Sequence, residues 1–196
     1  MVKKAVAVVL TAAMALTVGT SAFAAEDETE KKDFYITEAT TLSDIVEYTN
    51  PEEYAQMPAE IKERLETAYV KDYKSAENNS TSDEQARAIL LNGHINKYVG
   101  NINAHGFYYN TGISMNMVCP YIYFETIIYE HNTGKLITSS YDADYNTDSV
   151  STSETVTDLE PTTWYDMVMF GDVIPPEGYI TLVDDLKDTD YIHTSK

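Results

Sequence analysis

Cysteine is almost absent from this sequence: the 196 residues include one, Cys119. A single cysteine cannot form an intramolecular disulfide, and it cannot supply the several thiolates of a cysteine-based zinc site. We therefore expect a fold that is held together by the packing of its core.

Lysine and arginine are also scarce, since 13 basic residues stand against 32 acidic ones and the formal net charge is −19. DNA, RNA and anionic lipid surfaces are bound mainly through Lys and Arg, so we expect no nucleic-acid partner. A hydrophobic share of 43% and a charged share of 23% are those of a globular domain. The composition excludes a wholly disordered chain and a multi-span membrane protein.

The N-terminal segment lacks the roughly 20 consecutive apolar residues that a membrane span needs. It has two lysines at 3–4, an apolar run over 5–18, and small residues at Ala22 and Ala24. These parts are typical of a cleaved secretory signal. We predict a signal peptide over 1–24, of bacterial type, secretion of the mature protein, and no membrane insertion after the signal is removed.

The next residues differ in character from the rest of the chain. Residues 25–40 begin with a run of acids and lysines, which predicts a charged flexible tail. Residues 41–76 are predicted to be helical. Asn50 before Pro51 is a favourable helix start, and Pro58 is expected to begin a further helix. Apolar residues then follow at helical spacing: Ile61, Leu65, Ala68, Tyr69 and Tyr73. This stripe packs either on the rest of the chain or in the groove of a partner protein.

The remaining sequence is typical of β-structure. Residues 77–87 are polar and predict a linker, whereas 88–186 contain alternating and β-branched runs separated by turn residues. Cys119 continues an alternating apolar set that begins at Ile113, so it is predicted to be a buried, unreactive thiol. About seven strands are expected in 88–186, the number found in an immunoglobulin-like antiparallel β-sandwich. Residues 187–196 are predicted to be a C-terminal tail.

One segment resembles a known family. Leu159, Pro161, Thr163 and Tyr165 match the Leu-x-Pro-x-Thr-x-Tyr corner that precedes the sixth strand of fibronectin type III domains. The resemblance implies a tyrosine corner, in which the ring of Tyr165 is buried and its hydroxyl hydrogen-bonds to the backbone a few residues upstream. It implies a structural role for these four residues, and a binding or spacer module without catalytic residues.

Oxygen-bearing side chains alternate in one acidic segment, at Asp142, Asp144, Asn146 and Asp148. Such alternation is typical of a Ca²⁺-binding loop. The pattern departs from that loop at Thr147, where a sharp turn needs Gly, and at Ser153, where a bidentate Glu is needed. Two interpretations stay open, a solvated acidic turn between strands and a weak Ca²⁺ site, and no other cofactor is expected.

The sequence contains no familiar catalytic motif. His94, His105 and His131 lack the paired spacing of a zinc site, and neither Gly-x-Ser-x-Gly nor His-Glu-x-x-His occurs. A small secreted hydrolase is a further alternative, and it would need a histidine that converges in a pocket with Cys119 or with an acid. We expect surface histidines instead, and no enzymatic activity.

Tyrosine supplies 16 of the 22 aromatic residues. Exposed rings stack on sugars and bind proteins, whereas buried rings complete a core. The candidate binding residues are Tyr108, Tyr109, Tyr121, Tyr123 and Trp164. We predict a secreted, non-catalytic interaction module whose partner is an unknown protein or glycan. A carbohydrate-binding module with a Tyr/Trp face is the alternative.

The exported protein is expected to begin at Ala25 or Glu26, because the small residues before these positions suit signal cleavage. Intact-mass spectrometry of protein recovered from the culture medium measures this directly. Recovery of a secreted chain that still begins at Met1 would contradict the prediction.

Overall fold

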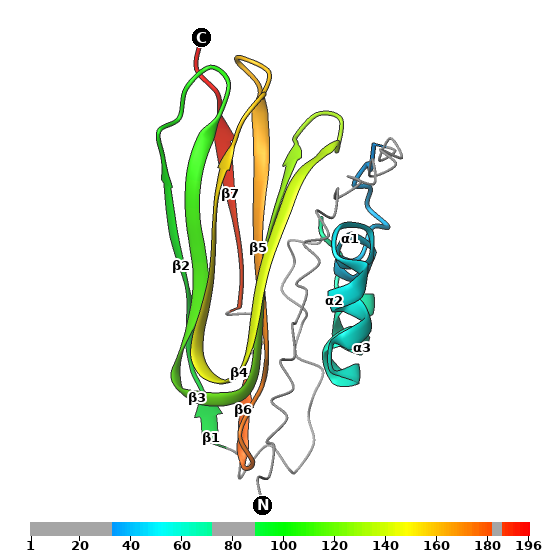
Figure 1. The fold of residues 1–196 in the computed structure, drawn as a ribbon, viewed down its shortest axis with the longest axis vertical. Coiled ribbons are helices and arrows are strands. Elements are labelled where there is room, and N and C mark those ends of the chain that lie inside the picture. The colour runs from blue at the N-terminus through cyan, green and yellow to red at the C-terminus, as the bar shows by residue number, and fades with distance from the viewer. Residues whose placement is uncertain (1–32, 72–88, 182–185) are drawn as a thin grey trace, which may run out of the picture. The chain divides into compact units, whose positions relative to one another are not determined.

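The computed structural model describes residues 33–71, 89–181 and 186–196, so the predicted signal peptide and linker lie outside the described residues. Within the described part the chain is mainly β. A small helical segment precedes a curled antiparallel sheet, as Figure 1 shows. None of the described helices is long and apolar enough to cross a membrane.

The helical segment consists of α1 (Leu42–Thr49), α2 (Pro51–Gln56) and α3 (Ala59–Thr67). A reciprocal cap begins α1. The Thr41 hydroxyl accepts a hydrogen bond from the Asp44 N–H at 3.2 Å, and the Asp44 carboxylate accepts one from the Thr41 N–H at 2.8 Å. The predicted starts of α2 and α3 at their prolines are confirmed, since Pro has no N–H to lose at a helix start.

The apolar stripe of α3 packs on the sheet of the same chain. Ile61 and Leu65 are fully buried, and they share one core cluster with residues of α1 and of the sheet, among them Phe170. Tyr69 lies beyond the helix, where it forms a β-bridge with Thr41. The stripe is therefore occupied within the chain, which decides between the two interpretations that the sequence left open.

Five strands form the curled sheet. They are β2 (Gly93–Gly100), β3 (Phe107–Glu130), β4 (Leu136–Val156), β5 (Trp164–Ile174) and β7 (Lys187–His193). Two three-residue strands, β1 (Ile89–Leu91) and β6 (Tyr179–Thr181), form a separate parallel pair. A turn between residues 130 and 136 joins β3 to β4, and Gly134 adopts a positive φ of 73°, which glycine allows without strain.

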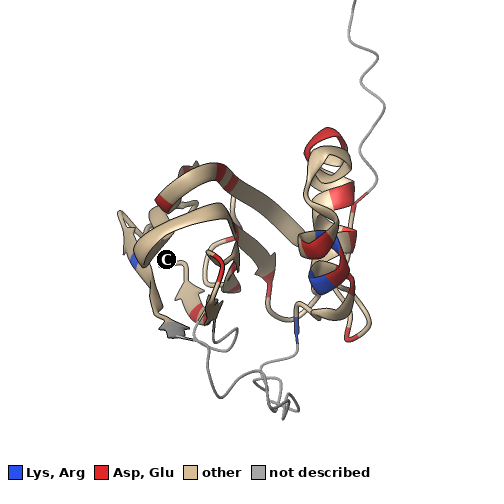
Figure 2. Ribbon diagram, turned by 90° about the horizontal axis from the view of Figure 1, so that it is seen from below, with Lys and Arg blue, Asp and Glu red and all other residues tan. Residues whose placement is uncertain are grey.

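The long strands β3 and β4 fold the sheet over on itself. β4 pairs with both halves of β3, whereas β2 pairs only with the first half and β5 only with the second. The register between β3 and β4 shifts between Ser114 and Cys119, next to Pro120, which has no N–H for a ladder. The two halves of the sheet consequently face each other around a core that includes Cys119 (Figures 1 and 2).

This arrangement differs in detail from the predicted sandwich. The mainly β, antiparallel character is confirmed. However, one continuous sheet makes both walls of the core, because β3 and β4 are long enough to belong to both halves. The edge strands β2 and β7 are also linked, since Lys97 Nζ lies 3.0 Å from Asp188 Oδ2 and 3.2 Å from Asp190 Oδ2.

Two predicted tails are wrong where the structure describes them. In the segment 33–40, Ile36 is buried and its N–H donates to the Gly134 carbonyl at 2.7 Å. In the segment 187–196, β7 pairs with β5 and Ile192 enters the core. Both segments are ordered by pairing with residues that are distant in sequence, Lys135 for the first and β5 for the second, which a local pattern does not show.

A buried ion pair joins α3 to β5. Arg64 Nε lies 2.7 Å from Asp172 Oδ2, and the Arg64 guanidinium also donates to the Val173 carbonyl at 3.2 Å. Burial raises the pKa of Asp172 to about 6, although the nearby Arg64 opposes this rise. Arg64 also lies 3.7 Å from the exposed Glu60, one helical turn before it. Arg64 therefore links the helical segment to the sheet.

A second carboxyl group, that of Glu125, is fully buried on the face of β3 that the helical segment covers. Tyr123 donates a hydrogen bond to its Oε2 at 2.6 Å, and Ser139 donates one to its Oε1. Burial raises the pKa of Glu125 to about 7, while these two hydrogen bonds act in the opposite direction.

Removal of Arg64 is expected to destabilise the fold. Arg64→Met leaves a buried carboxylate without its cation, and loss of one partner from a buried pair typically costs roughly 3–5 kcal/mol. The loss of stability should be smaller in acid, where Asp172 is protonated. Urea unfolding at about pH 5 and pH 8 measures it.

The double variant Arg64→Met, Asp172→Asn is the matched control. It should recover most of the stability at pH 8, because position 172 then carries no charge that needs a cation beside it. An equal loss in the single variant at both pH values would contradict this account.

Glu125→Gln is expected to stabilise the protein at neutral and alkaline pH. The pKa of Glu125 is higher in the folded protein than in the unfolded chain, so stability is fully present below about pH 4.5 and falls as the pH rises towards 7. Glutamine removes this decline, which amounts to a few kcal/mol at about 1.4 kcal/mol per pKa unit. The free energy of unfolding across pH 4–8 should become flatter, and an unchanged pH profile would argue against the buried carboxylate.

Candidate ligand-binding pocket

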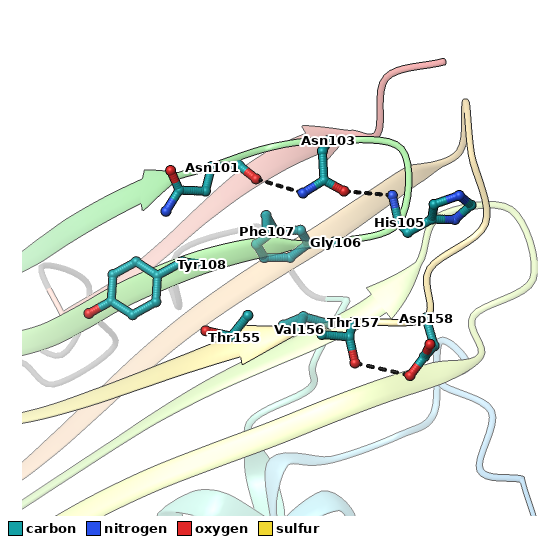
Figure 3. A pocket seen from close by; sticks show the side chains of 10 residues that line it. All are labelled: Asn101, Asn103, His105, Gly106, Phe107, Tyr108, Thr155, Val156, Thr157 and Asp158. Atoms are coloured by element: carbon teal, nitrogen blue, oxygen red, sulfur yellow. Dashed lines mark hydrogen bonds between the residues drawn. The ribbon is translucent and has the colours of Figure 1, made fainter.

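A hollow of about 330 Å³ lies where the β2–β3 loop meets the end of β4 (Figure 3). Pockets that hold small ligands begin at about this volume. Its lining includes Asn101, His105, Tyr108, Thr155, Thr157 and Asp158. Figure 3 shows that these side chains come from two chain segments that lie far apart in the sequence.

The β2–β3 loop is shaped by its own polar residues. The Asn103 side chain accepts a hydrogen bond from the His105 N–H at 2.9 Å, and its amide donates to the Asn101 carbonyl at 3.2 Å. Asn101 adopts a positive φ of 57°, a conformation that Asn tolerates better than most residues. A Cβ at Gly106 would clash with the Val156 carbonyl, so glycine allows the loop to approach β4.

The chemistry of the pocket is polar and aromatic. The ring of Tyr108 is half-buried, and the ring of the exposed Tyr98 lies 6.3 Å from it between centroids. The Thr157 hydroxyl donates to Asp158 Oδ2 at 3.0 Å, which leaves the other carboxylate oxygen to accept from a ligand. Together with the amide of Asn101, these groups can bind a neutral molecule that carries hydroxyl or amide groups.

The five predicted aromatic binding residues do not share one face. Tyr109, Tyr121 and Tyr123 are buried, so the prediction of a binding face is wrong for these three. Tyr108 lines the pocket, and Trp164 is about half exposed at the start of β5. The second half of β3 is covered on both faces, by the core of the curled sheet on one side and by helices on the other. Alternation therefore does not predict the burial of Tyr121 and Tyr123, whereas Tyr109 lies in the first half of β3 and is buried in the core of the curled sheet.

The predicted calcium loop is not a loop. Asp142, Asp144, Asn146 and Asp148 all belong to the continuous strand β4. Alternate residues of a strand lie about 6.6 Å apart, whereas Ca²⁺ ligands converge to within about 2.5 Å of the ion. Within the described residues, no three His, Cys, Asp or Glu side chains are grouped so that they could hold a metal ion. Asp142 instead accepts a hydrogen bond from the Ser151 N–H at 3.1 Å.

The residues considered for catalysis are dispersed. Cys119 is buried, which raises the pKa of its thiol, and its Sγ lies 3.5 Å from the Met117 carbonyl oxygen. His94, His105 and His131 are exposed, in agreement with the expected surface positions. His131 Nδ1 lies 2.7 Å from Asp166 Oδ1, a pairing that the sequence did not indicate.

The segment that resembles fibronectin type III has the hydrogen bond of a tyrosine corner. Tyr165 and Leu159 are buried, and the Tyr165 hydroxyl accepts a hydrogen bond from the Glu160 N–H at 3.0 Å. Thr163 donates to the Pro161 carbonyl at 3.3 Å. The corner thus fixes the chain just before β5.

Sequence reasoning missed most of the pocket. Asn101 and Asp158 are not among the predicted binding residues, although both are short polar residues in turns, where a positive φ is common. The polar run from Asn101 to Gly106 was the available signal, since it separates two strand-like segments. The sequence does not show that this polar run lies beside the end of β4, because that contact depends on the pairing of β3 with β4.

No protein-family model matches the sequence, and no curated protein matches it. The sensor domain of the anti-sigma factor RsgI4 of Pseudobacteroides cellulosolvens is similar in structure with a TM-score of 0.35 and 14% identity, over 54% of this chain and 89% of that one. A Bacteroides uniformis β-glucuronidase has a TM-score of 0.32 and 10% identity, over 52% of this chain and 13% of that one. At these scores neither likeness carries an argument about function.

Proposed function

We propose that the protein is an exported, non-catalytic interaction module, and that its pocket binds one neutral polar group of its partner. The observation that carries the proposal is the pocket itself, in which the half-buried ring of Tyr108 and the amide of Asn101 lie at one end and the carboxylate of Asp158 lies at the other. An aromatic ring with a few convergent polar groups is the usual composition of a ligand site.

Charge narrows the class of partner. The 32 acidic residues against 13 basic ones disfavour polyanions, and the pocket itself contributes a carboxylate at Asp158. The predicted secretory signal supports an extracellular partner. Kinship with fibronectin type III domains stays a prediction, which the tyrosine corner at Tyr165 supports.

A carbohydrate is the second candidate, and the pair of rings at Tyr98 and Tyr108 favours it. Aromatic rings present a flat apolar surface with a polar rim, and amide, hydroxyl and carboxylate groups hydrogen-bond to sugar hydroxyls.

NMR titration of the ¹⁵N-labelled mature chain with neutral monosaccharides, N-acetyl sugars and short neutral peptides tests the proposal. Resonances of 101–108 and 155–158 are expected to shift together. Tyr108→Ala should weaken binding by about tenfold, since such a ring is a typical hot spot. Tyr145→Ala removes an exposed ring from the middle of β4 and is the matched control.

Failure of every compound to shift these resonances would overturn the assignment of the pocket. Equal effects of Tyr108→Ala and Tyr145→Ala would also do so. Conversion of a bound compound into a product would contradict the non-catalytic part of the proposal.

A further inference from the structure

The outer face of β5 and β7 carries a row of exposed rings, which we call the aromatic strip: Trp164, His193, Tyr191 and His131. In the β5–β7 register Trp164 pairs with His193, and Asp166 pairs with Tyr191. The side chains of Trp164, His193 and Tyr191 therefore lie on one face of the sheet, together with that of Asp166. His131 follows β3 and joins them from the hairpin, where its N–H donates to the Trp164 carbonyl at 3.0 Å.

The rings of the strip form two pairs and remain accessible. Trp164 is 49% exposed and Tyr191 is 53% exposed. The centroids of Trp164 and His193 lie 4.6 Å apart, and those of His131 and Tyr191 lie 6.2 Å apart. Exposed large rings are usually scattered singly, whereas these two pairs are neighbours, because Tyr191 and His193 are alternate residues of β7.

A buried carboxylate orients one member of the strip, His131. Asp166 is only 3% exposed, and its Oδ1 lies 2.7 Å from His131 Nδ1, which fixes the orientation of the imidazole. The other ring nitrogen, Nε2, is left for a ligand. A surface whose rings are fixed before binding loses less entropy when a ligand arrives.

The helical segment covers the same face of the sheet up to the border of the strip. Val168 and Phe170, further along β5, are buried beneath the helices. Lys187 Nζ donates to the Tyr69 carbonyl at 3.0 Å, and Lys71 Nζ lies 5.9 Å from the centre of the Tyr129 ring. Among the described residues, this cover ends beside Asp166, the register partner of Tyr129.

The chemistry of the strip favours a neutral sugar chain over other occupants. Its rings offer apolar faces for the C–H surfaces of sugars, and the indole N–H, the tyrosine hydroxyl and the imidazole nitrogens are placed to hydrogen-bond to hydroxyl groups. The buried residue beneath the strip, Asp166, is an acid, and the whole chain has an acidic excess, which disfavours anionic chains as partners. Diagonal neighbours on paired strands lie about 7–8 Å apart, which suits several linked rings better than one.

We propose that the aromatic strip is a second binding site, which takes a neutral hexose-based oligosaccharide or polysaccharide. The proposal rests on the function proposed above and names the class of partner. It adds a site on the outer face of β5 and β7 to the pocket beside the β2–β3 loop.

Tryptophan fluorescence reports on this site alone, because Trp164 is the one tryptophan of the sequence. Titration of the mature chain with hydroxyethylcellulose and xyloglucan, both neutral, is expected to shift or quench its emission. Polygalacturonate and alginate, both anionic, should leave the emission unchanged. Affinity electrophoresis in gels that contain the same polysaccharides gives the dissociation constants without a fluorescent probe.

Tyr191→Ala is expected to weaken retention in the neutral gels by about tenfold, and Trp164→Ala by at least as much. Tyr145→Ala removes an equally exposed ring from β4 and should leave retention unchanged. Trp164→Phe keeps an aromatic face, so it should retain part of the affinity and serves if the alanine variant does not fold.

Three results would overturn the strip as a glycan site. Neutral polysaccharides could leave both emission and mobility unchanged. Retention could instead depend on Tyr108 and not on Trp164, in which case the pocket and the proposed function stand without the strip. Sedimentation equilibrium could also show a dimer that Trp164→Ala dissociates, which would assign the strip to a second copy of the chain.

Discussion

The pairing of β3 with β4 is the constraint on which the rest of the structure depends. Both strands run through both halves of the sheet, and the irregular register between Ser114 and Cys119 lets them bend together. The bend brings the two halves face to face and closes a core without a disulfide. It also places β2 and β5 on the same edge of β3, at opposite ends.

A consequence of this pairing is that the second half of β3 has two faces to bury. One face enters the core of the curled sheet, and the other needs a cover, which the helical segment supplies. The cover also encloses charge, because Glu125 and the Arg64–Asp172 pair lie between helices and sheet. These groups make the contact between helices and sheet sensitive to pH, whereas the core of the curled sheet is mainly apolar and aromatic.

The two candidate binding surfaces lie where this burial ends. The pocket at Tyr108 forms where the first half of β3 leaves its loop, and the aromatic strip begins where the helical cover stops on β5. Both combine aromatic rings with amide, imidazole or carboxylate groups and carry little positive charge. Two such surfaces on one chain would raise the avidity for a repeating partner such as a polysaccharide, since the second contact is intramolecular once the first has formed.

Local pattern determined much of this protein from the sequence alone. Prolines marked the starts of α2 and α3, and alternation marked the inner face that holds Cys119, because each signal acts within a few residues. Only the tertiary structure decided the rest. The residues of the expected calcium loop lie within the long strand β4, and Lys187–His193 pairs with β5 as a strand. Tyr109 is buried in the core of the curled sheet, and Tyr121 and Tyr123 are buried beneath the helical segment. Each of these outcomes depends on partners distant in the chain, which local spacing does not encode.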